Sequence, residues 1–350
     1  MQKSQRDVLL GLVLLVVAGA GGAYLMMQPA TAKSTATSPA VSASKYPAAL
    51  VPFDGQNAMK YIKDICALGP RVSDTPAHAK MVDMVEKHFT EQGLTVSRQT
   101  FKAKQRSKLI EVPMTNLIAR WKPEAKVRLL ICTHYDTRPL ADRETNERDW
   151  KKPFVAANDG AAGVAYMMEM AKHLKALDAP LGIDFVCFDG EEYIFDNRQS
   201  DVGGDLYFFG SRHFADEYAK RISAGGDTWA YKQAVLLDMP AGIDARFLME
   251  GASVKGARDV VERIWKIAEE QGVKNFVTQR GLEALDDHLE LQRVGIPAID
   301  IIPVLPDNYQ GQGLVTYPHW HRLTDTPENC SADTLENVAK VLSVWLKTTK

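Results

Sequence analysis

The residues of this chain that could carry out chemistry are acids and histidines in six short motifs spread along the sequence. In chain order they are His134-Tyr135-Asp136, Asn158-Asp159-Gly160, Glu191-Glu192, Asp238, Asp286-Asp287-His288 and His319-Trp320-His321. Imidazole and carboxylate groups around an open coordination position are the ligands of catalytic zinc. Because a second glutamate beside a ligand would lie near the metal without binding it, that glutamate could serve as a general acid or base.

Taken singly, most of these motifs also have an ordinary structural explanation. His134 and Asp136 could form a hydrogen-bonded surface pair, and Asn158-Asp159-Gly160 could be a turn or a helix N-cap. The Glu191-Glu192 pair is harder to explain in this way, because adjacent carboxylates after an apolar run repel each other unless they are solvated or bound to a cation. The combination of all six motifs therefore favours a metal site.

Apolar runs that precede these motifs are the elements that would position them. Short β-branched runs alternate with helical patterns, which predicts an α/β fold with a mostly parallel sheet. In such a sheet the site lies beyond the carboxyl ends of the strands, where the polar motifs stand. The expected inner strands are 127–132, 183–188, 234–237 and 298–302, and the expected helices are 163–177, 254–271 and 334–347, the last with Ser331 as its N-cap.

The first 44 residues differ in composition from the rest of the chain. Val8–Met27 is an uncharged, mostly apolar run that follows Lys3 and Arg6, and as a helix it would be about 30 Å long, enough to cross a bilayer once. Residues 28–44 are rich in Ala, Ser, Thr and Pro and cannot bury a core. We therefore expect a signal anchor or signal peptide over 1–27, a linker over 28–44 and a single catalytic domain over 45–350.

The composition excludes several other classes of protein. The chain has 350 residues, of which 45% are hydrophobic and 25% charged, values typical of a folded globular protein. Lys and Arg number 42 against 44 acids, so the sequence shows no basic footprint for nucleic acid. The four cysteines form no CxxC pair, which argues against a zinc ribbon or a disulfide framework.

At this point the motifs resemble a known family. The order THYD, NDGAAGVA, FDGEE, FGSRHFA, LLDM, DDH and WH is similar to the zinc-dependent aminopeptidase superfamily, and within it to the glutaminyl-peptide cyclotransferases (glutaminyl cyclases), from about Leu68 to the C-terminal helix. Three features favour the cyclase branch: Asp286 precedes Asp287-His288, Trp320 precedes His321, and the connection from Tyr193 to Phe209 is long.

The resemblance implies a three-layer α/β/α sandwich and one zinc ion per chain. It assigns the metal ligands as Asp159, Glu192 and His321, the catalytic residues as Glu191, Asp238 and Asp286, and the substrate-binding residue as Trp320. Within this set Glu191 would be the general acid/base, and Asp238 and Asp286 would form a hydrogen-bonding pair beside it. His134 and Asp136 match the positions at which aminopeptidases hold a second zinc and its supporting carboxylate, so they are remnants of a second site in this reading.

The activity that the resemblance implies is conversion of an N-terminal glutamine of peptides or proteins to pyroglutamate, with release of ammonia. A zinc aminopeptidase with a water nucleophile is the alternative. An inactive, anchored binding module is less favoured, because Glu191 and all three expected ligands are present. Basic residues before the apolar run place the catalytic domain outside the plasma membrane on a single-pass anchor, or make it secreted or periplasmic if the run is cleaved. The sequence does not indicate the oligomeric state.

Overall fold

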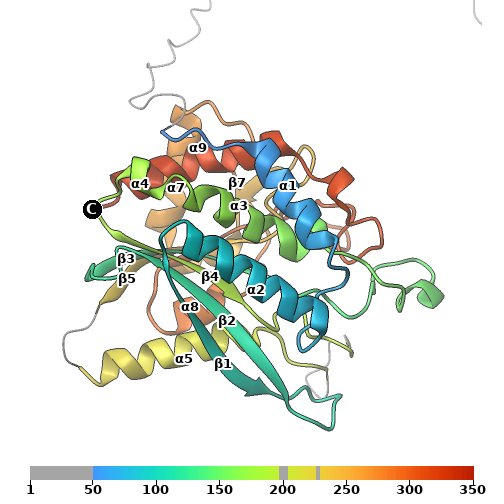
Figure 1. Cartoon of the computed structure of the whole chain (residues 1–350). Coiled ribbons are helices and arrows are strands. Elements are labelled where there is room, and N and C mark those ends of the chain that lie inside the picture. The colour runs from blue at the N-terminus through green and yellow to red at the C-terminus, as the bar shows by residue number, and fades with distance from the viewer. Residues whose placement is uncertain (1–49, 197–203, 226–228) are drawn as a thin grey trace, which may run out of the picture. The chain divides into compact units, whose positions relative to one another are not determined.

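The computed structural model describes residues 50–196, 204–225 and 229–350. Its centre is a six-stranded mixed sheet (Figure 1), in which β3, β4, β5 and β8 run parallel to one another while β2 runs antiparallel to both of its neighbours, β1 and β4. In spatial order the strands are β1 (Thr95–Ala103), β2 (Val112–Trp121), β4 (Gly182–Phe188), β3 (Val127–His134), β5 (Ala230–Leu237) and β8 (Ala298–Ile301). The four predicted strands are therefore all present, but β8 lies at one edge of the sheet and not inside it as predicted, and an antiparallel hairpin that was not predicted extends the opposite edge.

Helices cover both faces of this sheet (Figure 1). On one face lie α1 (Gly55–Cys66), α2 (Pro76–Glu91), α3 (Ala162–Ala171) and α9 (Ala332–Thr348), and on the other lie α5 (Phe209–Ser223) and α8 (His288–Arg293). Strand β3 shows why helices must pack on both faces of the sheet. Its residues point alternately to the two sides, so that Leu129 and Ile131 join one hydrophobic core while Leu130 and Cys132 join the other.

Two of the three predicted helices are interrupted. The helix expected over 163–177 ends at Ala171 and resumes as α4 (Leu174–Leu177), and the one expected over 254–271 is split into α6 (Gly251–Gly256) and α7 (Arg258–Glu270). The second break lies at Ala257, whose φ of −149° and ψ of 48° are not helical. The C-terminal helix α9 follows the prediction, and the Ser331 side chain caps it by accepting a hydrogen bond from the Thr334 N–H at 3.3 Å.

The remaining elements are short. Strands β6 (Phe247–Met249) and β7 (Phe276–Arg280) form a separate parallel pair. Single turns of 3₁₀-helix cover Glu147–Asp149 and Pro327–Asn329, and a π-type turn covers Ala157–Ala161 directly before α3. All four cysteines are buried free thiols.

The residues that the structure describes include no helix long and apolar enough to span a membrane. The apolar run Val8–Met27, the linker over 28–44 and the expected start of the catalytic domain at residue 45 lie outside the described residues.

Candidate active site

The carboxyl ends of the parallel strands open into a cleft of about 920 Å³. Its walls contain seven of the nine predicted site residues, namely Asp159, Glu191, Glu192, Asp238, Asp286, Trp320 and His321. The other two, His134 and Asp136, are buried and are not part of the cleft wall. These residues lie at the strand ends, as the sequence predicts, where the loops after β3, β4 and β5 converge.

Asp159, Glu192 and His321 form a group whose ligand atoms all lie within 4.8 Å of one another. His321 Nε2 is 3.1 Å from Glu192 Oε1 and 3.6 Å from Asp159 Oδ2. Each residue comes from a different loop: Asp159 lies before α3, Glu192 after β4 and His321 before α9. All three side chains are buried, so the set matches the carboxylate and imidazole donors that zinc takes in proteins.

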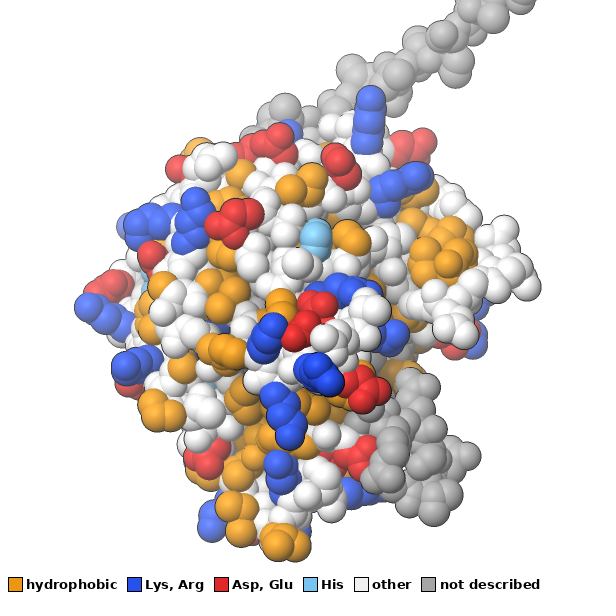
Figure 2. Space-filling model, turned by 90° about the vertical axis from the view of Figure 1, so that its right-hand side faces the viewer, with side chains coloured by type: hydrophobic (Ala, Val, Ile, Leu, Met, Phe, Trp, Pro, Cys, Tyr) orange, Lys and Arg blue, Asp and Glu red, His pale blue; other side chains and the backbone are white. Residues whose placement is uncertain are grey.

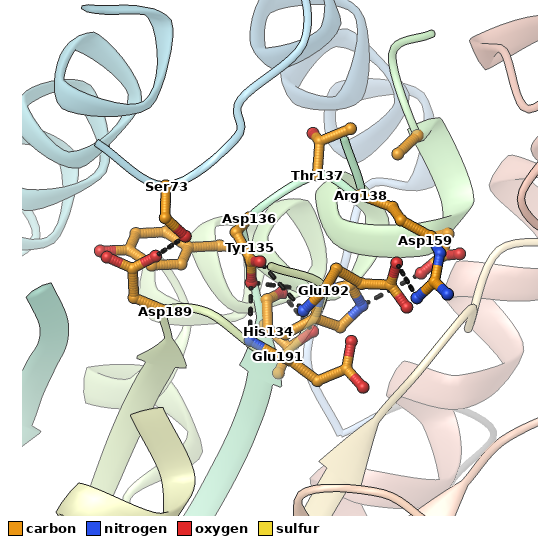
Figure 3. A network of polar contacts seen from close by, with 12 residues as sticks. Ser73, His134, Tyr135, Asp136, Thr137, Arg138, Asp159, Asp189, Glu191 and Glu192 are labelled. Carbon is orange, nitrogen blue, oxygen red and sulfur yellow. Dashed lines mark hydrogen bonds and ion pairs between the residues drawn. The ribbon is translucent and has the colours of Figure 1, made fainter. Parts of the chain in front are cut away.

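A second group shares Asp159 with the first. His134 Nε2 lies 3.1 Å from Asp159 Oδ1 and 3.5 Å from Asp238 Oδ1, and these three residues could also hold an ion. Asp159 therefore stands between the two groups, with one carboxylate oxygen directed at each histidine. The structure brings the predicted ligands and the predicted second-site remnants into one continuous cluster, of which Figure 3 shows His134, Asp136, Asp159 and Glu192.

Asp136 fixes the backbone that carries the glutamate pair. Its two carboxylate oxygens accept hydrogen bonds from the Glu191 N–H at 3.2 Å and the Glu192 N–H at 3.0 Å, as Figure 3 shows. The chain can turn here because Gly190 has a φ of +77°, a left-handed conformation that glycine adopts without steric cost. Asp136 is thus a positioning residue: it lies outside the cleft and holds the backbone from which both glutamate side chains extend.

Asp325 does the same for the loop that carries Asp159. It accepts hydrogen bonds from the backbone N–H of Asn158 at 2.9 Å and of Asp159 at 3.1 Å, and from the Tyr317 hydroxyl at 2.8 Å. The Asn158 side chain in turn accepts a hydrogen bond from the Ala241 N–H at 2.8 Å. Both acidic loops are therefore held by a buried carboxylate from another part of the chain.

The two adjacent glutamates have opposite electrostatic environments. Burial, and next the charge of Glu192, raise the pKa of Glu191 well above its ordinary value. Burial alone would also raise the pKa of Glu192, but the charges of Arg138 and His321 outweigh it and lower that pKa. One glutamate is therefore stabilised as an anion that could bind a cation, while its neighbour can hold a proton.

The predicted hydrogen bond between Asp238 and Asp286 is absent from the described structure. Asp238 lies beside His134 instead, and Asp286 Oδ1 accepts a hydrogen bond from the Asp287 N–H at 2.6 Å. The two carboxyl groups are still electrostatically linked, because burial and then the charge of Asp238 raise the pKa of Asp286 to about 7. The loop before α8 turns the Asp286 carboxyl toward its own backbone, which the sequence did not reveal.

Trp320 lines the cleft next to His321, as predicted, and the Arg143 guanidinium lies 4.4 Å from the centre of one of its rings. His321 itself has a φ of +54°, an uncommon backbone conformation for a residue with a Cβ atom. Such conformations persist where the surrounding structure fixes them, often at functional sites.

Several residues of the site were not singled out from the sequence, notably Arg138, Asp142, Tyr207 and Asp325. Arg138 and Asp142 belong to TRPLAD, which directly follows the predicted strand and the His134 motif. Their position after a strand that carries a site motif was an available signal. Their burial, by contrast, is evident only in the structure.

Comparison with known proteins defines the class to which this fold and site correspond. Residues 116–346 match peptidase family M28, and the chain belongs to that family. This match begins in β2 and ends in α9, so it contains every residue of the two candidate metal groups.

Within that class the chain is similar to glutaminyl cyclases. The crystal structure of Fimbriiglobus ruber glutaminyl cyclase has 45% sequence identity and a TM-score of 0.79, and the match covers 85% of this chain and 96% of that one. A Zn-dependent exopeptidase from Parabacteroides distasonis is 27% identical, with a TM-score of 0.76 and coverage of 85% and 99%. Glutaminyl-peptide cyclotransferase from Bothrops jararaca is 27% identical over an alignment of 266 residues, with coverage of 66% of this chain and 64% of that relative.

Proposed function

We propose that this protein is a zinc-dependent glutaminyl-peptide cyclotransferase that converts an N-terminal glutamine of peptides or proteins to pyroglutamate. The observation that carries the proposal is the cleft in which a three-residue metal group adjoins Glu191, a carboxyl group whose raised pKa suits proton transfer. The similarity to a glutaminyl cyclase over 85% of the chain supports the same assignment.

In this proposal Asp159, Glu192 and His321 hold one zinc ion. The metal supplies Lewis-acid chemistry, polarising the γ-carbonyl of the glutamine side chain. The Glu191 carboxylate accepts a proton from the substrate's α-amine as the amine nitrogen forms a bond to the side-chain carbonyl carbon (Cδ) of the glutamine. The bond from that carbon to the side-chain amide nitrogen then breaks, and Glu191 returns the proton to the departing nitrogen, which leaves as ammonia.

The other cleft residues would orient the substrate for this ring closure. Trp320 offers a flat apolar surface beside His321, against which the glutamine side chain can fold. Asp238 and Asp286 lie in the same wall as Glu191, and they could accept hydrogen bonds from the substrate's α-ammonium or amide N–H groups. Holding the amine close to the side-chain carbonyl carbon (Cδ) converts a slow reaction into an efficient one, because the reacting atoms no longer have to find each other.

A zinc aminopeptidase is the second candidate, and one observation favours it. The second group, His134, Asp159 and Asp238, could hold another ion beside the first. We nevertheless propose one zinc per chain, because Asp286 and Trp320 stand where the cyclase branch has its characteristic residues. Metal analysis of the purified protein tests this stoichiometry, since two tightly bound zinc ions would favour the aminopeptidase.

The activity itself is tested with a matched pair of peptides that begin with glutamine and with leucine. The cyclase proposal predicts that the glutamine peptide loses one molecule of ammonia while its backbone stays intact, and that the leucine peptide is unchanged. Release of free glutamine or free leucine would identify an aminopeptidase instead.

We also propose that residues 1–27 direct the protein out of the cytoplasm, as a signal anchor or a cleaved signal peptide, and that residues 28–44 are a tether. The catalytic domain over 45–350 would then act outside the plasma membrane on peptides that begin with glutamine. This proposal rests on the apolar run Val8–Met27 and the basic residues that precede it.

A further inference from the structure

Four buried side chains form a closed ring at the wall of the cleft. Glu192 and His321 face each other on one side of this ring, and Arg138 and Asp142 complete it on the other. Arg138 Nη1 donates to Glu192 Oε2 at 3.1 Å, and Arg138 Nη2 donates to Asp142 Oδ2 at 2.8 Å. Asp142 Oδ1 lies 3.1 Å from His321 Nδ1, and His321 Nε2 lies 3.1 Å from Glu192 Oε1.

Arg138 and Asp142 are buried and make several contacts each, so they are not an ordinary surface ion pair. Their side chains are 3% and 4% exposed, and two guanidinium nitrogens of Arg138 contact the same oxygen of Asp142. Arg138 also donates to the Tyr207 hydroxyl at 3.3 Å, and its direction toward Glu192 is visible in Figure 3. Buried ion pairs of this kind gain from good geometry and additional hydrogen bonds, both of which are present here.

The ring leaves one atom of each partner free for a metal. The outer atoms Glu192 Oε2 and His321 Nδ1 are occupied by Arg138 and Asp142, so the inner atoms Oε1 and Nε2 point toward each other. Because the Asp142 carboxylate can only accept, it favours the proton on His321 Nδ1 and leaves the Nε2 lone pair free for coordination.

The charges of this part of the site also fit a divalent cation. With a metal on Nε2 the His321 ring would be neutral, so Glu192, Asp142 and Asp159 would contribute three negative charges against one positive charge on Arg138, a net charge of −2. One divalent ion would balance that charge. Without Arg138 the same site would hold three uncompensated carboxylates.

We propose that Arg138 and Asp142 act as a strap, a pair of positioning residues that orients Glu192 and His321 for metal binding. The inference rests on the proposed metal site and deepens it, since it assigns metal affinity to two residues that do not touch the metal. Loss of such supporting contacts typically weakens metal binding by about 10- to 100-fold.

The test measures the zinc dissociation constant of the metal-free full-length protein by competition with a chelator. It compares wild type with Asp142→Ala and with Arg138→Lys, a variant that keeps the charge but loses the planar fork. Asp142→Asn is the conservative variant, because its side-chain oxygen can still accept from His321 Nδ1. We expect zinc binding to weaken by about 10- to 100-fold in Asp142→Ala and Arg138→Lys, with partial recovery in Asp142→Asn.

Arg128→Lys is the matched control. Arg128 forms a buried ion pair with Asp184 whose side chains are both 0% exposed, and neither residue lines the cleft. Both lysine variants should lose thermal stability, whereas only Arg138→Lys should lose zinc affinity and change the visible absorption spectrum of the cobalt-substituted protein.

The outcomes separate this inference from the proposed function. Tight zinc binding in wild type with unchanged affinity in Asp142→Ala and Arg138→Lys would overturn the strap and leave the metal site intact. Failure of wild type itself to bind zinc would overturn the metal site, and the strap with it.

Discussion

At the scale of single residues, the site depends on two neighbouring glutamates whose surroundings shift their pKa values in opposite directions. Glu192 is held as an anion by Arg138 and His321, while burial keeps Glu191 ready to hold a proton. Pairs of carboxyl groups whose environments separate their pKa values are a recurring way to divide an acid/base role from a binding role. The same division distinguishes the expected effects of mutating each residue.

Glu191→Gln tests the proposed acid/base role. We expect the variant to retain its zinc and to lose about 10²- to 10⁴-fold in turnover of a glutamine peptide, because an amide cannot relay the proton. Steady-state kinetics and metal analysis of the same preparation provide both readouts. Glu283→Gln is a suitable control, because Glu283 lines the same cleft but contacts Lys255 and Arg280. Full activity in Glu191→Gln would refute the assignment.

His321→Ala tests the metal-binding role. The variant removes the one imidazole of its group, so we expect the purified protein to contain much less zinc and to have little activity even with excess peptide. A variant that keeps its full zinc content would show that the ion lies elsewhere, for example in the group formed by His134, Asp159 and Asp238.

At the scale of elements, strand ends and tight turns place these residues. A Cβ atom at Gly190, in the turn after β4, would lie 2.5 Å from the Met114 sulfur and 2.8 Å from its methyl carbon, so the buried Met114 side chain would have to shift. Asp136, in the loop after β3, then fixes the two peptide groups that follow. The orientation of the Glu191 and Glu192 side chains therefore depends on the backbone at the ends of two neighbouring strands, β3 and β4.

Gly190→Ala should therefore be costly both to stability and to activity. The left-handed φ costs about 1 kcal/mol for alanine, and forcing Met114 aside should cost roughly a further 1–3 kcal/mol. Gly272→Ala is the matched control, because Gly272 has a φ of +66° with no atom within 4 Å of an added Cβ. Denaturant unfolding and activity per folded molecule distinguish the two variants. Equal losses would show that packing at Gly190 is unimportant.

The elements that the sequence predicted are those with an unambiguous pattern. The predicted segments of β3, β4, β5 and β8 are apolar runs that are almost wholly buried, whereas β1 has exposed residues along most of its length. Its sequence, TVSRQTFKA, contains too few apolar residues to mark it as part of a core. The break at Ala257 was equally hidden, because alanine is a strong helix former and the apolar spacing continues across it.

The site residues that could be predicted are those that belong to short local motifs. Acids and histidines that follow apolar runs could be recognised one by one, and the fold brings them together at one edge of the sheet. Contacts between distant segments were not recognisable. Asp325 holds a loop more than 160 residues earlier, and Asp142 contacts His321 across 179 positions. Such pairs are determined by tertiary packing rather than by local sequence.

At the scale of the whole molecule, the folded domain carries a surface of mixed charge. Figure 2 shows Lys, Arg, Asp and Glu side chains interspersed on one face, in keeping with a net charge of −2 for the chain. Binding to a membrane would therefore depend on the N-terminal segment in our proposal, and the catalytic domain would be free to meet peptide substrates.

This view predicts the behaviour of the full-length protein in cells. It should fractionate with membranes, and protease added from outside should release the catalytic domain by cutting within residues 28–44. A version that begins at residue 45 should be recovered without membranes and with the same activity. A full-length protein that remains in the cytosol and resists external protease would refute the topology. Recovery of a free, extracytoplasmic form would show that the signal is cleaved.

The central claim is that the nucleophile belongs to the substrate and is not water. Fold and most site residues are shared between cyclases and aminopeptidases, so only the chemistry of the product separates them. The most direct measurement is mass spectrometry of the products formed from a glutamine peptide in water labelled with heavy oxygen. We predict a peptide lighter by one molecule of ammonia, with no heavy oxygen incorporated. Free glutamine that carries the label in its carboxyl group would contradict the proposed function.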